Sequence, residues 1–288
     1  MKRFIIIVLC LAVSRLSVWA QEPVHEFSVF TGLGLSSLRY QLSQGDRSGG
    51  FGGDFGVCYT YFRSDVRVTG TGRVFHEQWG ILAGLGLGFY NAKSTMGNNE
   101  EIVIEGLRDN DIVPDRFNLH STLTGYKESQ KTTYLNIPVM AQFQLDRYYA
   151  LTGFKFGIPV GGKFKSKDAT IINKAYYPDY ENELTGPNSQ GLGTFAHKSD
   201  GKIKFGVTLM WTFEGGLNWR LTKNFSLYSG VYFDVGLNNA AKNLQKQFVE
   251  FDYNAAGNRF STNSMMSSFT ERVNIMAVGV KLRLAYVR

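Results

Sequence analysis

The chain has 288 residues, of which 43% are hydrophobic, 19% charged and 14% aromatic, with 32 glycines and only 6 prolines. This composition excludes a disordered or collagen-like protein and allows one all-β domain or two ordinary domains. The sustained apolar stretch at residues 4–13 is far shorter than the roughly 18–20 residues of a membrane-spanning helix. A helical membrane protein is therefore excluded. A membrane β-barrel is still allowed, because its strands alternate and score weakly on hydropathy.

The N-terminus has the pattern of a secretory signal peptide, which we expect to span residues 1–20. Lys2 and Arg3 precede the apolar stretch, and a small-residue cleavage site ends at Ala20. Cleavage removes three of the 31 basic residues, so the formal net charge falls from +7 to +4 (28 basic minus 24 acidic residues). It also leaves Cys58 as the remaining cysteine, which predicts no intramolecular disulfide.

From residue 27 onward the hydrophobic pattern has a period of two, which predicts strands rather than helices. Along each segment, apolar or aromatic side chains alternate with small, polar or charged ones. The segments cover residues 27–35, 51–61, 79–89, 135–145, 148–160, 205–219, 225–237 and 276–286. We therefore expect eight strands in an all-β fold.

The links between these segments fall into two kinds. Long polar links follow the odd-numbered strands, at residues 36–50, 93–132, 161–204 and 238–272, and shorter links follow the even-numbered ones, at residues 63–78, 146–147 and 222–224. Short turns on one rim and long extracellular loops on the other are typical of an outer-membrane barrel. The pattern predicts one antiparallel, transmembrane up-and-down β-barrel domain over residues 21–288. The 63–78 link leaves ten strands open, because Val66, Val68 and Val74 either extend the flanking strands or form an extra hairpin.

Charged residues share one face of the predicted strands, and the other face is almost entirely apolar. A charge on the lipid face costs about 2–4 kcal/mol near the bilayer midplane, so we assign the charged face to the lumen. An eight-stranded barrel is only wide enough for its side chains to fill it. We expect a structural network of salt bridges that plugs the lumen, with a gated ion path as the alternative. The network residues are Asp54, Lys155, Glu214, Arg220, Asp234, Lys281 and Arg283.

Glycines and aromatic residues fit the same barrel. Gly84, Gly86 and Gly88 recur at every second position and are expected to face the lumen, where they leave room for long side chains opposite. Aromatic residues near strand ends are expected to form interfacial girdles, with the core of a sandwich as the alternative. These residues are Trp79, Tyr148, Trp219, Phe225 and Tyr286.

Three segments resemble the strands of small outer-membrane β-barrel proteins of the OmpA-type and PorT-like families of Gram-negative bacteria. They are residues 55–61, residues 79–90 and the Tyr-Leu-Asn-Ile-Pro-Val segment at residues 134–139. The resemblance extends over essentially the whole mature chain and implies an integral protein of the cell outer membrane.

Catalytic, metal and nucleic-acid sites have weak support in the sequence. None of the four histidines has metal-ligand spacing, and the acidic residues between 100 and 115 lack the spacing of a calcium loop. We expect no metal, no cofactor and no enzyme activity. The alternative is a hydrolase or acyltransferase at the rim, built on His120 and Ser121 near Asp109, Asp111 and Asp115. Lysines and carboxylates are mixed within residues 163–183, so nucleic-acid binding is not expected.

We therefore expect a barrel that acts as a scaffold, with recognition carried by its long loops. Outer-membrane lipid is the expected surrounding, and Lys163 and Lys165 suggest contact with lipopolysaccharide. An unknown extracellular ligand or envelope protein is the expected partner of the loops. The alternatives are a narrow pore, an accessory component of an envelope secretion complex, and a soluble periplasmic β-sandwich.

Overall fold

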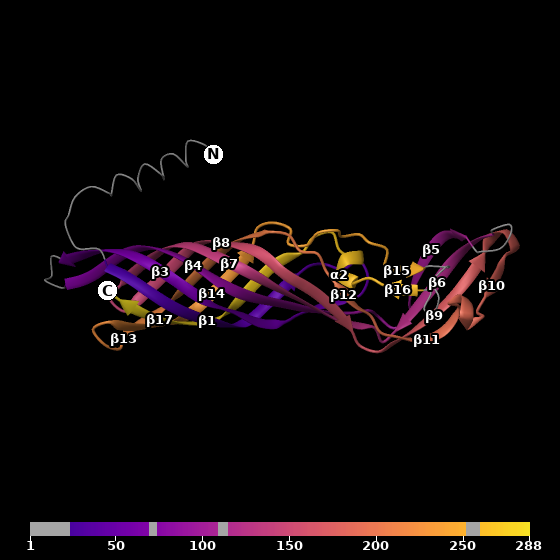
Figure 1. Cartoon of the computed structure of the whole chain (residues 1–288), viewed down its shortest axis with the longest axis horizontal. Coiled ribbons are helices and arrows are strands. Elements are labelled where there is room, and N and C mark those ends of the chain that lie inside the picture. Colours follow the sequence, from indigo (N-terminus) through magenta and orange to yellow (C-terminus); the bar gives the residue numbers. More distant parts are fainter. Residues whose placement is uncertain (1–23, 69–73, 109–114, 252–259) are drawn as a thin grey trace, which may run out of the picture.

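The computed structural model describes residues 24–68, 74–108, 115–251 and 260–288 and is built almost entirely of β-strands. Eight long antiparallel strands form a closed barrel at one end of an elongated molecule (Figure 1). The barrel strands are β1 (Val24–Arg39), β3 (Phe51–Val68), β4 (Val74–Thr95), β7 (Lys127–Leu145), β8 (Tyr148–Ser166), β13 (Thr208–Arg220), β14 (Phe225–Gly236) and β17 (Asn274–Val287). The expected signal peptide, residues 1–20, lies outside the described residues.

The barrel closes through the pairing of its first and last strands. Strand β1 pairs with β17 on one side and with β3 on the other, and the remaining strands pair in the order of the chain. The prediction of an eight-stranded antiparallel barrel is confirmed. The 63–78 link adds no further strand to it, because β3 and β4 continue as one long hairpin as far as the Val68–Val74 pair.

The two faces of the barrel wall differ in the way that the alternation predicts. Outward apolar side chains are exposed, for example Val57 at 56% and Val280 at 61%, whereas inward neighbours are buried. Aromatic rings gather on the outside near the end with short turns. Trp79 and Phe143 have ring centroids 4.7 Å apart, and Phe225 packs on Tyr286 in the same way. A surface of this kind is stable against lipid rather than water.

Two of the long links expected as polar loops fold into a second sheet. Strands β4, β7 and β8 continue past the apolar band, and beyond them a five-stranded sheet lies at the far end of the molecule (Figure 1). This distal sheet consists of β5 (Glu100–Arg108), β6 (Arg116–Thr124), β9 (Ala169–Tyr177), β10 (Asn182–Leu184) and β11 (Gly193–His197). The links at 93–132 and 161–204, expected as long polar loops, thus contain strands that pair with one another and bury an apolar face.

The distal sheet has a hydrophobic core of its own, separate from the lumen. Leu119, Leu123 and Ile171 are fully buried in this core. It is covered by the fourth long link, residues 238–272, which forms β15 (Val249–Phe251), β16 (Phe260–Thr262) and the short helix α2 (Met265–Ser268). The remaining short elements are β2 (Asp46–Gly49), β12 (Asp200–Lys202) and the 3-10 turns η1 (Pro178–Tyr180) and η2 (Asn188–Gln190).

A second apolar cluster closes the barrel at its loop end. It packs Tyr90, Tyr134 and Met210 from the wall against Phe205 and Met266 from the links above. The alternation placed Phe205 on the lipid face of the sixth strand, and this is wrong. Strand β13 begins only at Thr208, so the chain before it turns inward and buries Phe205. Within the described ranges, no helix is long and apolar enough to cross a membrane.

Candidate functional site

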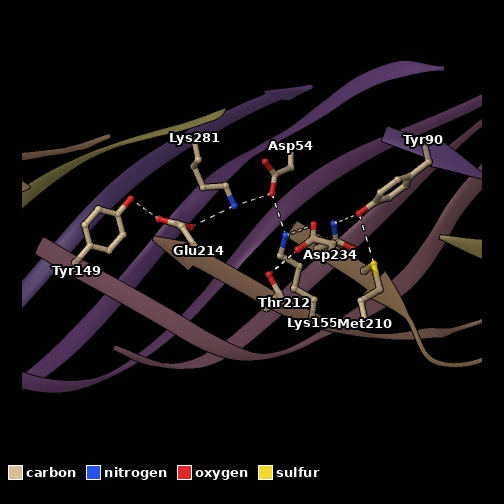
Figure 2. A network of polar contacts seen from close by, with 10 residues as sticks. Asp54, Tyr90, Tyr149, Lys155, Met210, Thr212, Glu214, Asp234 and Lys281 are labelled. Atoms are coloured by element: carbon tan, nitrogen blue, oxygen red, sulfur yellow. Dashed lines mark hydrogen bonds and ion pairs between the residues drawn. The ribbon is translucent and has the colours of Figure 1, made fainter. Parts of the chain in front are cut away.

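The centre of the lumen holds a network of charged side chains from opposite walls of the barrel (Figure 2). Lys155 on β8 donates to Asp234 Oδ2 at 2.7 Å and to Asp54 Oδ2 at 3.3 Å. All three side chains are at most 7% exposed. Because Asp54 lies on β3 and Asp234 on β14, this single ammonium group links strands that are far apart around the barrel.

A second lysine continues the network toward the end with short turns. Lys281 Nζ lies 3.1 Å from Asp54 Oδ2 and 3.6 Å from Glu214 Oε2. Tyr149 donates to the other oxygen of Glu214 at 3.0 Å (Figure 2). The Lys281 ammonium also lies 4.8 Å from the ring centroid of Tyr232. Most of the buried charged groups therefore lie next to an opposite charge or an aromatic ring. A low-dielectric interior requires such partners, because an unpaired buried charge is costly.

Arg283 forms the next layer with residues that the sequence reasoning missed. Its guanidinium stacks 4.2 Å from the Tyr228 ring centroid and donates to Gln142 Oε1 at 3.1 Å. Tyr228 in turn donates to the buried carboxylate of Glu26 at 2.9 Å. The sequence pattern does place Glu26 on the lumen face, because Glu26 precedes Ser28 by two residues and so lies on the same side of the strand. The predicted first strand began at Phe27, however, whereas β1 begins at Val24.

The structure brings six of the seven predicted network residues into the lumen. The seventh, Arg220, is exposed at the last position of β13, where the strand has already passed the lumen. The lumen is tightly filled around the other six. A Cβ atom on Gly32 would lie 2.3 Å from Asp54 Oδ1, and one on Gly88 would lie 2.4 Å from Asn136 Nδ2. At these positions only glycine leaves room for the polar side chains.

Two hollows of 590 and 440 Å³ lie on the outer wall of the barrel rather than in its lumen. Exposed apolar residues line them, and both share Val29, Val57 and Leu85. Their lining matches acyl chains of the surrounding lipid, so we do not treat them as active sites. The geometry of the lumen fits a structural core, whereas the distal sheet presents polar groups to solvent.

The solvent-facing side of the distal sheet carries a small polar cluster. His120 Nδ1 lies 2.8 Å from Glu101 Oε1, and Tyr176 packs edge-on against the His120 ring. Lys174 donates to Glu183 at 2.9 Å on a neighbouring part of the same face. These residues come from adjacent strands β5, β6, β9 and β10, whose register places them side by side.

The rim catalytic pair considered from the sequence does not form. His120 and Ser121 are consecutive residues of strand β6, so their side chains point to opposite faces of the sheet. Ser121 is fully buried and donates to Asn173 Oδ1 at 2.8 Å. Asp115 lies 3.2 Å from the Tyr180 hydroxyl. Asp109 and Asp111 lie outside the described residues.

His197, at the end of β11, is a structural residue. Its Nε2 lies 2.8 Å from Thr262 Oγ1 of β16, and its ring packs on Phe260. Burial lowers the pKa of this imidazole below its ordinary value, which favours the neutral form. The histidine thus ties the distal sheet to the hairpin above it. No group of three or more potential metal ligands occurs among the residues that the structure describes.

A family model described as the outer membrane protein beta-barrel domain matches residues 19–242. The match covers well over half of the chain, so this protein belongs to that family of outer-membrane β-barrels. The protein is therefore located in the outer membrane. In barrels of this kind the short turns are periplasmic and the long loops extracellular, which places the distal sheet outside the cell.

A comparison with curated proteins gives no match. Two solved structures illustrate how distant the structural relatives are. The translocator domain of the autotransporter NalP from Neisseria meningitidis is 10% identical, with a TM-score of 0.15, over 99% of this chain and 95% of that one. A FadL homologue from Pseudomonas aeruginosa is 7% identical, with a TM-score of 0.16, over 93% and 90% of the two chains.

Proposed function

We propose that this protein is a closed outer-membrane scaffold that presents its distal sheet for recognition at the cell surface. The observation that carries the proposal is the separation of two cores. Charged and aromatic side chains fill the barrel lumen, and an independent apolar core supports the distal sheet beyond the membrane. A rigid frame that holds a polar, solvent-facing surface is the usual arrangement of binding proteins.

The same observations speak against the competing functions. A pore needs a continuous polar path, whereas here the charges pair within the lumen and an apolar cluster lies above them. A rim hydrolase or acyltransferase needs a nucleophile beside a base, and His120 and Ser121 face opposite sides of β6. We propose that the protein has no enzyme activity and no cofactor. Its partner is an extracellular ligand or another envelope protein, and a part in an envelope secretion complex is the runner-up.

The proposal includes export by residues 1–20, with cleavage near Ala20, and a relationship to the OmpA-type and PorT-like barrels. Both rest on the sequence. The N-terminal pattern is that of a signal peptide, and the segments at 55–61, 79–90 and 134–139 carry the resemblance.

Surface labelling tests the display of the distal sheet. Val103 on β5 is 44% exposed on the solvent-facing side, and Lys223 is exposed in the turn between β13 and β14. We expect a membrane-impermeant maleimide to label Val103→Cys in intact cells, and Lys223→Cys only after lysis. The unsubstituted chain provides the background, because Cys58 is buried. Labelling of Lys223→Cys but not Val103→Cys in intact cells would reverse the orientation and overturn the proposal.

A further inference from the structure

Five exposed lysines form a patch on the outer wall of the barrel, just beyond the apolar band. They are Lys93 on β4, Lys131 on β7, Lys163 and Lys165 on β8, and Lys202 on β12. We call this group the lysine patch. The strand register fixes its layout, because Lys131 is directly opposite Lys163, and Lys163 is directly opposite Lys202. Neighbouring strands are about 4.8 Å apart, so these three lysines start from adjacent positions of one row.

The patch carries a strong excess of positive charge. Directly opposed like charges on neighbouring strands destabilise a sheet unless something compensates them. Asp200, opposite Lys165, is the acidic residue in the same rows. Within the described part of the chain, none of the five lysines has an ion pair with a carboxylate. An external anion bound to the row Lys131–Lys163–Lys202 would relieve this repulsion.

The position of the patch indicates which anion is available. One step closer to the membrane, the same strands present Phe89, Thr133 and Gly161 in register, and Ile158 and Val160 follow as exposed apolar residues. On β7 and β8 lysine follows at the level of Lys131 and Lys163, and on β4 it follows one step further out, because Asn91 is opposite Lys131 and Lys93 comes next on that face. This level is the extracellular boundary of the bilayer, where headgroups lie against a transmembrane barrel.

We propose that the lysine patch binds the phosphate groups of lipopolysaccharide, the phosphorylated glycolipid of the outer leaflet, with its acyl chains against the apolar wall below. Lysine binds phosphate as a compact point charge without fixed geometry, which suits a row of flexible side chains at a lipid surface. The sequence suggested Lys163 and Lys165. The register adds Lys93, Lys131 and Lys202, which lie far away in the chain. The inference depends on the extracellular position of the loops and is independent of the scaffold function.

The test compares two triple variants of the full-length protein in detergent. Lys131→Gln, Lys163→Gln and Lys202→Gln together remove the row, and Lys198→Gln, Lys223→Gln and Lys246→Gln remove the same charge elsewhere. All six lysines are exposed, so both variants are expected to fold, as a heat-modifiable gel shift verifies. The probe is diphosphorylated lipid A, with dephosphorylated lipid A and phosphatidylglycerol as comparison ligands.

A lysine near an anionic membrane surface contributes about fivefold in affinity. We therefore expect the row variant to bind diphosphorylated lipid A at least about tenfold more weakly than the unsubstituted protein, and the control variant to bind it unchanged. Dephosphorylated lipid A should bind weakly to all three proteins. Unchanged binding by the row variant would overturn the proposal, and so would an equal loss in the control variant. Phosphatidylglycerol bound as tightly as diphosphorylated lipid A would overturn the assignment to the glycolipid.

Discussion

Lys155→Met is expected to destabilise the barrel by about 3–5 kcal/mol, the usual loss when one partner of a buried charge network is removed. Lys155 is 2% exposed and holds Asp234 and Asp54 at 2.7 and 3.3 Å. Without its ammonium group, Asp234 keeps a hydrogen bond from the hydroxyl of Thr212 but loses its cation, whereas Asp54 keeps Lys281. Urea unfolding of the protein in lipid vesicles measures the loss.

The matched control for this variant is Lys163→Met on the same strand. Lys163 is exposed on the outer wall, so its replacement should change the stability by less than about 0.5 kcal/mol. A double variant, Lys155→Met with Asp234→Asn, should lose less than the sum of the two single variants, because the pair is coupled. A Lys155→Met barrel as stable as the Lys163→Met control would show that the network does not support the fold.

Leu119→Ala is expected to destabilise the distal sheet by about 2–5 kcal/mol while leaving the barrel folded. Leu119 is fully buried at the centre of strand β6, and removal of a buried leucine side chain costs this amount through lost burial and the cavity left behind. The distal core and the cluster at the barrel mouth are distinct clusters that meet at the partly buried Leu42, and Leu119 belongs to the distal one, so the effect should stay local. Limited proteolysis should cleave within residues 100–124 or 169–197, which form the distal sheet, while the heat-modifiable shift of the barrel is retained.

Leu184→Ala makes the same substitution on the same sheet at a side chain that is 39% exposed, and it should leave the proteolysis pattern unchanged. The account of two separate cores would be contradicted if Leu119→Ala unfolded the barrel together with the distal sheet. It would also be contradicted if Leu119→Ala behaved like Leu184→Ala.

The barrel was predictable from the sequence because lipid imposes a strict alternation. A residue such as Val57 faces lipid and must be apolar, whereas Asp54, on the opposite face of the same strand, must point into the lumen, so the period of two reveals both faces of each strand. The number of strands followed from the same pattern. The pairing of side chains within the lumen could not be predicted in this way. Lys155 and Asp234 meet across the barrel, and no local pattern specifies which side chains reach one another there.

The distal sheet could not be predicted from the sequence because its outer face is exposed to solvent and carries polar residues. Phe117, Leu119 and Leu123 do alternate along β6, but His120 and Thr122 between them resemble loop residues, and β5 begins with two glutamates. The pairing of β6 with β9 joins two links that are separated by strands β7 and β8, so the shared core becomes visible only in three dimensions. The sequence suggested only Lys163 and Lys165 of the lysine patch, because the other three lysines join them through strand pairing that is visible only in three dimensions.

Recording of the purified protein in planar lipid bilayers is the most direct test of the closed scaffold. Lys155 and Lys281 pair with carboxylates across the lumen, and the apolar cluster with Tyr90, Tyr134 and Met210 closes its extracellular end. We therefore predict a membrane-inserted, heat-modifiable protein that gives no stable current steps in concentrated KCl. Reproducible open-channel steps of uniform size, altered by Lys281→Met or Asp234→Asn, would place an ion path through the lumen and contradict the account.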